Sequence, residues 1–137
     1  MGHEKQIIGK RGELSVLGEL LKRGFDIYIP LVDVGIDCVV RTKGNNFKEI
    51  QIKTRTPTDK GRICDVKMFE PKGNFFIIYR LDGEKDENGE DIYWIIPSEV
   101  FYSKANLARK GEFLRVGMND KRKSEIKDYK NNFGLLE

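Results

Sequence analysis

The feature that most constrains the fold is the alternation of apolar and polar residues in the stretch from Phe47 to Thr54, which is regular from Glu49 to Lys53. Ile50 and Ile52 alternate with Gln51 and Lys53 along this stretch. Successive side chains of a strand point to opposite faces, so the two isoleucines share one face and the amide and the lysine share the other. The pattern therefore predicts a strand with one buried face and one face that carries Gln51 and Lys53 together.

A second strand is expected from Ile36 to Arg41, joined to the first by a turn at residues 43–46. Asp37 lies at the start of this strand, on the face opposite its apolar residues. Antiparallel pairing through the turn would bring Asp37 close to Gln51 and Lys53. A carboxylate, a second oxygen ligand and a lysine on rigid backbone can hold a hard divalent cation and present a positive charge beside it.

A helix is expected from about residue 6 to residue 23, with an apolar stripe formed by Val16, Leu17 and Leu20. Glu13 falls within that stripe and is expected to face the sheet. A lone glutamate at the edge of such a stripe would ordinarily reach solvent. Its position before the hairpin favours another interpretation, because a metal site needs a carboxylate from a third element.

Gly9 and Gly12 flank Glu13 within the expected helix. A glycine inside a helix costs ~1 kcal/mol relative to alanine. Close approach of the helix to the sheet or to a phosphate would explain this cost, and so would fraying near the helix start.

The segment from Thr54 to Arg62 is polar and contains Pro57 and Gly61, which is typical of a loop. It places Arg55, Lys60 and Arg62 directly downstream of the candidate site. These side chains could clamp a phosphate backbone, or the segment could be an ordinary solvated loop.

Two further acids lie near the candidate site in the sequence. Asp33 could assist a metal, but an aspartate before a tight turn ordinarily serves the hydrogen bonds of the turn. Glu49 shares the strand face of Gln51 and Lys53 and could add a negative charge. It is nearer the hairpin end, where solvated glutamates are common.

The remaining elements complete one domain over residues 1–137. The sequence predicts strands at 25–30, 74–80 and 91–96, a helix from Ser98 to about Lys110 with Ser98 as its cap, a short strand at 113–116, and a helix-like end carrying Ile126, Tyr129 and Phe133. The core order is α-β-β-β-(β)-β-α. This order indicates an α/β or α+β fold, with a mixed sheet covered by helices.

Composition excludes several classes of chemistry. The chain has one histidine, His3, so Ser-His-Asp hydrolysis, Cys-His hydrolysis and zinc proteolysis all lack their imidazole. Cys38 and Cys64 lie in apolar surroundings without a CxxC spacing, so buried thiols are expected. The net charge of +3 permits nucleic-acid binding if the basic residues cluster.

No apolar run approaches the ~20 residues that a membrane-spanning helix needs, and the N-terminus lacks the apolar region of a signal peptide. We therefore expect no membrane association and a cytoplasmic location.

Together, Glu13, Asp37, Gln51 and Lys53 resemble the signature of the PD-(D/E)XK nucleases, a superfamily that includes restriction endonucleases, homing endonucleases and Holliday-junction resolvases. Gly-Ile-Asp-Cys-Val-Val at 35–40 resembles the G-x-D strand, and Gln-Ile-Lys-Thr-Arg at 51–55 resembles the (D/E)-x-K strand. The match covers roughly residues 7 to 97. Gln51 departs from the commoner acid and gives a Q-x-K variant.

The resemblance implies a restriction-endonuclease-like fold and a metal-dependent DNA endonuclease. Asp37, Gln51 and the Ile52 carbonyl would bind Mg²⁺, or Mn²⁺ as a substitute, with Glu13 binding directly or through water. Lys53 would orient the attacking water or neutralise charge on the phosphate. DNA would contact Lys10, Arg55, Lys60 and Arg62, and a homodimer would cut both strands.

Two alternatives stay open on the sequence. The chain could be a non-catalytic module that keeps the nuclease fold and binds nucleic acid, an interpretation favoured by the neutral Gln51. A purely structural or partner-binding role would predict no metal affinity.

Overall fold

The fold begins with a long helix that crosses one face of a sheet. The computed structural model describes residues 2–32, 34–56 and 62–137. Helix α1 (Gly2–Lys22) buries Gly12, Val16 and Leu20. Gly24 follows with φ of 87°, a left-handed conformation that glycine adopts without the clash of a Cβ, and it ends the helix as expected.

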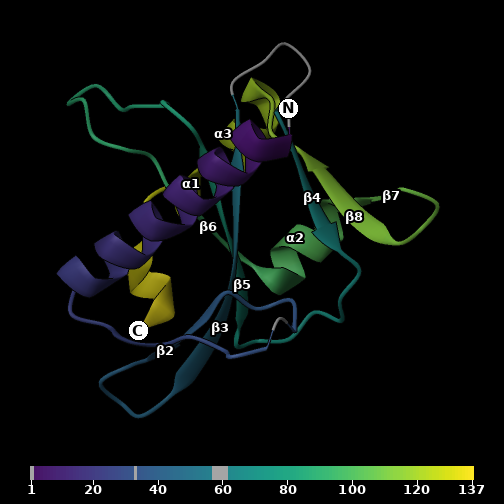
Figure 1. Ribbon diagram of the computed structural model, residues 1–137. Coiled ribbons are helices and arrows are strands. Elements are labelled where there is room, and N and C mark those ends of the chain that lie inside the picture. The colour runs from purple at the N-terminus through teal and green to yellow at the C-terminus, as the bar shows by residue number, and fades with distance from the viewer. Residues whose placement is uncertain (1, 33, 57–61) are drawn as a thin grey trace.

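A five-stranded mixed sheet lies at the centre of the molecule (Figure 1). Its order is β1-β2-β3-β5-β6, with strands β1 (Asp26–Tyr28), β2 (Cys38–Arg41), β3 (Phe47–Arg55), β5 (Phe75–Leu81) and β6 (Trp94–Pro97). Neighbouring strands are antiparallel except β3 and β5, which are parallel. The α+β architecture expected from the sequence, with a mixed sheet flanked by helices, is confirmed.

Each face of this sheet is covered by its own apolar cluster. On one face, α1 packs through Val16 and Leu20 against Ile50 and Ile52 of β3. On the other face, a second sheet and helix α2 (Ser98–Lys104) pack against β5. All seven residues of β5 are buried, because both of its faces are covered.

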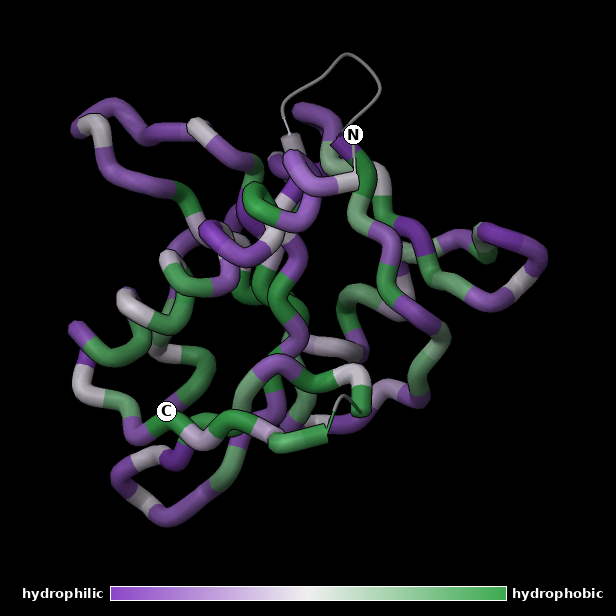
Figure 2. Tube along the Cα trace, viewed as in Figure 1, coloured by the Kyte–Doolittle hydropathy of each residue, from purple (hydrophilic) through white to green (hydrophobic). Residues whose placement is uncertain are grey.

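The second sheet has the order β4-β8-β7 and comes from segments far apart in the sequence. Strand β4 (Ile63–Lys67) pairs with β8 (Phe113–Gly117), which pairs in turn with β7 (Asn106–Ala108), all antiparallel. Figure 2 shows the tube to be largely hydrophilic in the outer loops and hydrophobic along the central strands.

The C-terminal segment closes both apolar clusters. It forms α3 (Asp120–Glu125) and the short 3-10 helices η1 (Lys127–Tyr129) and η2 (Phe133–Leu136). Ile126 joins the cluster under the second sheet, while Phe133 and Leu136 join the cluster under α1. Within the described residues, no helix has the length and apolar content that crossing a bilayer requires.

Two sequence-based predictions about the second half are wrong. The helix expected to reach about Lys110 stops at Lys104, because the residues after it pair with β8 as strand β7. Ser98 does not cap that helix: its hydroxyl donates to the Lys72 carbonyl and accepts from the Lys72 amide instead. Strand β4 was not predicted at all.

Gly12 lets α1 approach β3 closely. A Cβ built on Gly12 would overlap the side chain of Thr54, whereas a Cβ on Gly9 or Gly18 would meet nothing within 4 Å. Close approach of helix to sheet therefore explains the glycine at position 12. Gly9 has no such packing reason.

We predict that Gly12→Ala will lower the free energy of unfolding by about 1 to 3 kcal/mol, because the added methyl group forces the helix away from the strand. Gly18→Ala in the same helix is the matched control and should raise stability by about 0.5 to 1 kcal/mol through helix propensity alone. Urea denaturation of the three proteins measures both effects. Equal stabilisation by the two changes would contradict the close packing.

Candidate active site

The site forms where the edge of β3 is left uncovered. Strand β2 pairs with β3 only from Cys38 opposite Ile50 to Arg41 opposite Phe47, whereas β3 continues to Arg55 alongside β5. Among the described residues, the second half of β3 therefore has no strand partner on the β2 side. A strand edge with unpaired amide and carbonyl groups needs other hydrogen-bonding partners.

Asp37 supplies the first of these partners. Its amide donates to the Ile50 carbonyl at 2.8 Å, and its Oδ2 accepts the Ile52 amide at 2.6 Å. The side chain thus continues the ladder by one step after the backbone of β2 turns away. Amide and carbonyl of one strand residue project from the same edge, so the Ile52 carbonyl also points to this side.

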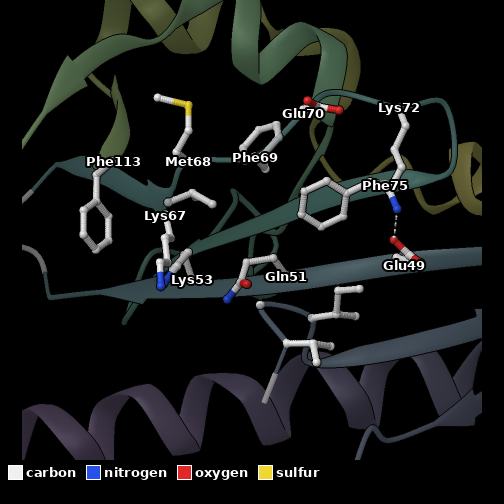
Figure 3. Close-up of a pocket in the computed structure, with 14 residues that line it drawn as sticks. Glu49, Gln51, Lys53, Lys67, Met68, Phe69, Glu70, Lys72, Phe75 and Phe113 are labelled. Atoms are coloured by element: carbon white, nitrogen blue, oxygen red, sulfur yellow. Dashed lines mark ion pairs between the residues drawn. The ribbon is translucent and has the colours of Figure 1, made fainter. Parts of the chain in front are cut away.

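Gln51 and Lys53 lie beside this carboxylate. Gln51 Nε2 donates to Asp37 Oδ2 at 3.1 Å. Ile50 and Ile52 are buried, and Figure 3 shows Gln51 and Lys53 on the opposite face of β3, at the border of a cavity. The alternation expected for this strand is confirmed.

Glu13 reaches the same place from α1. Two polar contacts hold the helix on either side of it: Arg11 pairs with Asp82 at 2.6 Å, and the Ser15 and Tyr93 hydroxyl oxygens are 2.7 Å apart. The Glu13 side chain is 25% exposed, so it is turned partly inward.

Glu13, Asp37, Gln51, Ile52 and Lys53 line one cavity of about 340 Å³. The helix, the start of β2 and the open edge of β3 therefore bring together all four side chains named from the sequence, with the Ile52 backbone between them. Within the described residues there is no group of three or more His, Cys, Asp or Glu side chains placed to hold a metal. Among the residues named from the sequence, Glu13 and Asp37 are the carboxylates that line this cavity.

Two buried thiols respond to the charges of the site. Burial raises the pKa of Cys38 to about 12, and the carboxylates of Asp37 and Glu13 act in the same direction. Burial also raises the pKa of Cys64 to about 12, while the charges of Lys53 and Arg55 oppose that rise. Both cysteines are free and buried, as expected, and both are neutral thiols at pH 7.

The other residues named from the sequence lie in different places. Arg55 lines the cavity. Lys10 is two-thirds exposed and pairs with Glu13 at 3.3 Å. Arg62 is half exposed, lies 3.9 Å from Asp120 and lines neither of the two cavities at the site. Lys60 falls outside the described residues.

Of the two additional acids, Glu49 does not join the carboxylates of the site. Glu49 pairs with Lys72 at 2.8 Å (Figure 3) and borders a different, wider cavity. Asp33 lies outside the described residues. That wider cavity measures about 840 Å³ and shares Gln51, Lys53 and Phe113 with the smaller one, so the two adjoin at β3.

Sequence reasoning missed three further residues that line the smaller cavity, from the second sheet and its β7–β8 turn: Asp65, Arg109 and Phe113. Asp65 accepts two hydrogen bonds from Arg115, at 2.7 and 2.8 Å, and lies 3.3 Å from Arg109. The Arg115 hydrogen bonds hold the pKa of the Asp65 carboxyl below its ordinary value, and the charge of Arg109 adds to this against the effect of burial.

No family model matches the chain, and no curated protein matches its sequence. Solved structures do match. A bacterial homing endonuclease, I-Ssp6803I, superposes with a TM-score of 0.65 over 96% of this chain and 91% of that one, at 17% identity. The Holliday junction resolvase Hjc of Archaeoglobus fulgidus superposes with a TM-score of 0.53 over 80% of this chain and 83% of that one, at 15% identity.

The chain has the restriction-endonuclease-like fold of these two structures. The expected resemblance is confirmed at this level, and the mixed sheet with its flanking helices agrees with it. At such low identity the likeness establishes the fold alone. The chemistry must be argued from the residues at the open edge of β3.

The Asp65 pair predicts a pH dependence of stability. A carboxyl whose pKa is lowered on folding adds stability above its unfolded pKa of about 3.9, and this is lost as the pH falls through the lower folded value. Asp65→Asn should therefore cost about 1 to 3 kcal/mol near neutral pH and much less at roughly pH 2.5. Urea denaturation at both pH values measures this. The same cost at both would show that the ion pair is not responsible.

Proposed function

We propose that this protein is a metal-dependent DNA endonuclease that hydrolyses phosphodiester bonds at the cavity formed by Glu13, Asp37, Gln51 and Lys53. The observation that carries the proposal is the meeting of these four side chains at the open edge of β3. The homing endonuclease and the resolvase with the same fold make DNA the substrate to test first.

The donor atoms of the cavity suit Mg²⁺. Asp37 and Glu13 offer carboxylate oxygens, Ile52 a backbone carbonyl and Gln51 its amide oxygen, since the Gln51 nitrogen is turned to Asp37. Mg²⁺ prefers oxygen ligands and is commonly held by one or two protein carboxylates together with waters and substrate phosphates. The residues therefore fit this ion, or Mn²⁺ in its place. When bound, it would polarise the scissile phosphate and lower the pKa of a water.

Lys53 would act on the phosphate side of the same cavity. It lies two residues beyond Gln51 on the same face of β3 and is partly exposed, so its ammonium group can meet a substrate. In this role it neutralises charge that develops on the phosphate oxygens or orients the attacking water. No histidine is needed, and the single one, His3, is exposed near the start of α1.

DNA would be held by the basic side chains nearest the cavity. Arg55 lines it, and Lys10 lies one helical turn before Glu13. We also expect contacts from Lys60 and Arg62 in the segment after β3. A symmetric homodimer would present two such sites to the two strands of a duplex, and we expect the protein to act in the cytoplasm.

A non-catalytic DNA-binding module is the second candidate function. Gln51 favours it, because an amide brings no negative charge and leaves the cavity with weaker affinity for a cation than an acid would. Such a module would keep the basic residues and bind DNA without cutting it.

The first test is nicking of supercoiled and branched DNA with Mg²⁺ or Mn²⁺. Asp37→Asn keeps an acceptor for the Ile52 amide but removes the charge, and should abolish both metal binding and cleavage. Lys53→Ala should keep metal binding and lower the cleavage rate by about 10²- to 10³-fold. Lys48→Ala, on the same strand and away from both cavities, is the control and should cut like the wild type.

The second test concerns Gln51. Gln51→Glu places a second carboxylate where the amide is now 3.1 Å from Asp37. Repulsion should lower the stability of the metal-free protein, and divalent ions should bind more tightly than to the wild type. Calorimetry with Mn²⁺ and thermal melting with and without the ion measure both effects. If neither protein binds a divalent ion and neither cuts DNA, the non-catalytic module takes the place of the enzyme.

A further inference from the structure

The outward face of the second sheet forms the wall of the site opposite α1. Residues directly opposite each other in an antiparallel pair share a face, so Asp65 lies beside Arg115 and Lys67 beside Phe113. The alternate residues of β4, Cys64 and Val66, are buried in the core. The polar face of this sheet is therefore turned away from the core, and residues from it line both cavities.

A buried carboxylate holds two arginines on this face. The Asp65 side chain is 4% exposed, whereas Arg115 and Arg109 are 42% and 54% exposed. Asp65 engages Nε and Nη2 of Arg115, so Nη1 has no hydrogen-bond partner among the described residues. Two guanidinium groups on one carboxylate leave a net positive charge at the surface.

The turn between β7 and β8 fixes the position of Arg109. Arg109 and Lys110 have φ of 50° and 60°, left-handed values that cost a residue with a Cβ roughly 1 kcal/mol or more, and Gly111 follows at 83°. The guanidinium of Arg109 lies 4.5 Å from the centre of the Phe113 ring. Stacking on Phe113 and pairing with Asp65 thus hold a cation at the border of the smaller cavity.

Lys67 adds a third cation on the same face. It is exposed and lines the wider cavity together with Lys53. Figure 3 shows the Lys53 and Lys67 side chains extending toward the same part of that cavity. The two ammonium groups repel each other unless an anion lies between them, and a DNA phosphate would be such an anion.

We propose that Lys67, Arg109 and Arg115 form a second wall that binds DNA phosphates on either side of the one held at Gln51 and Lys53, with Asp65 as their positioning residue. The inference rests on the proposed function, because it places the DNA backbone between β3 and the second sheet. Guanidinium groups with free donors on a rigid support match the geometry of phosphate oxygens.

The experiment measures binding of a fluorescent DNA duplex in EDTA by anisotropy, between about 50 and 200 mM salt. Lys67→Gln, Arg109→Gln and Arg115→Gln should each lower the log-log salt slope by about one unit. Arg41→Gln is the matched control, since Arg41 is also a strand arginine, 40% exposed and paired to an aspartate at 2.8 Å, but it belongs to β2 of the central sheet and not to the second sheet. Its slope should equal that of the wild type.

The variant Asp65→Asn tests whether Asp65 positions the two arginines or affects DNA binding only through its negative charge. Removing a negative charge from a basic wall would strengthen DNA binding if charge alone mattered, whereas loss of the arginine support should weaken it. Weaker binding with an otherwise folded protein, checked by thermal melting, supports the positioning role, and tighter binding overturns it. If the three basic variants match Arg41→Gln, the wall itself is wrong.

The two proposals fail in different ways. If the wild type binds DNA in EDTA but never nicks it with Mg²⁺, the proposed endonuclease activity is wrong. The three basic variants then still test whether Lys67, Arg109 and Arg115 bind DNA. If the wild type nicks DNA and all three basic variants bind DNA as the Arg41→Gln control does, the second wall is wrong and the endonuclease proposal stands. A wild type with no DNA affinity at all overturns both.

Discussion

The structure of the site depends on the bond between the Asp37 carboxylate and the Ile52 amide. A strand that loses its neighbour halfway along exposes amides and carbonyls that must find other partners. Here a side chain takes over from a backbone, and the same oxygen also accepts from Gln51. The start of β2 thereby becomes a place where a carboxylate, an amide and a carbonyl are held close together without burying an unpaired charge.

The open edge of β3 can hold a site because side chains from both faces of the sheet extend to it. Glu13 comes from the α1 side, which lies near because Gly12 permits close contact with Thr54. Lys53 comes from the opposite face, and the second sheet adds Asp65 and Arg109 beyond it. The side chain of a residue inside a fully paired sheet would meet only the layer that covers its own face. The termination of β2 is thus the step that turns a structural sheet into a candidate site.

The part of the site formed by α1, β2 and β3 could be predicted from the sequence, whereas the part formed by the second sheet could not, and the reason is physical. Alternation along β3 is a local signal, so Gln51 and Lys53 could be placed on one face from the sequence, and the hairpin brought Asp37 to them. The strand expected at 113–116 is β8, but its two partner strands were missed. Strand β4 pairs with β8 across 46 to 54 residues of sequence, and β7 pairs with β8 across a turn of left-handed residues, and intrinsic propensity describes neither pairing. Asn106 to Ala108 became a strand because β8 was available to pair with it.

Gln51 can be understood from the charges around it. A glutamate at this position would place a second carboxylate beside that of Asp37, and the repulsion between them would destabilise the metal-free site. The amide instead donates a hydrogen bond to Asp37 and stabilises the metal-free site. The same bond orients the amide oxygen away from Asp37, where it can serve as a ligand. Compared with a glutamate, Gln51 therefore stabilises the metal-free site but brings no negative charge to it. The positive charges of Lys53 and Arg55 in the same cavity favour an anion such as a phosphate.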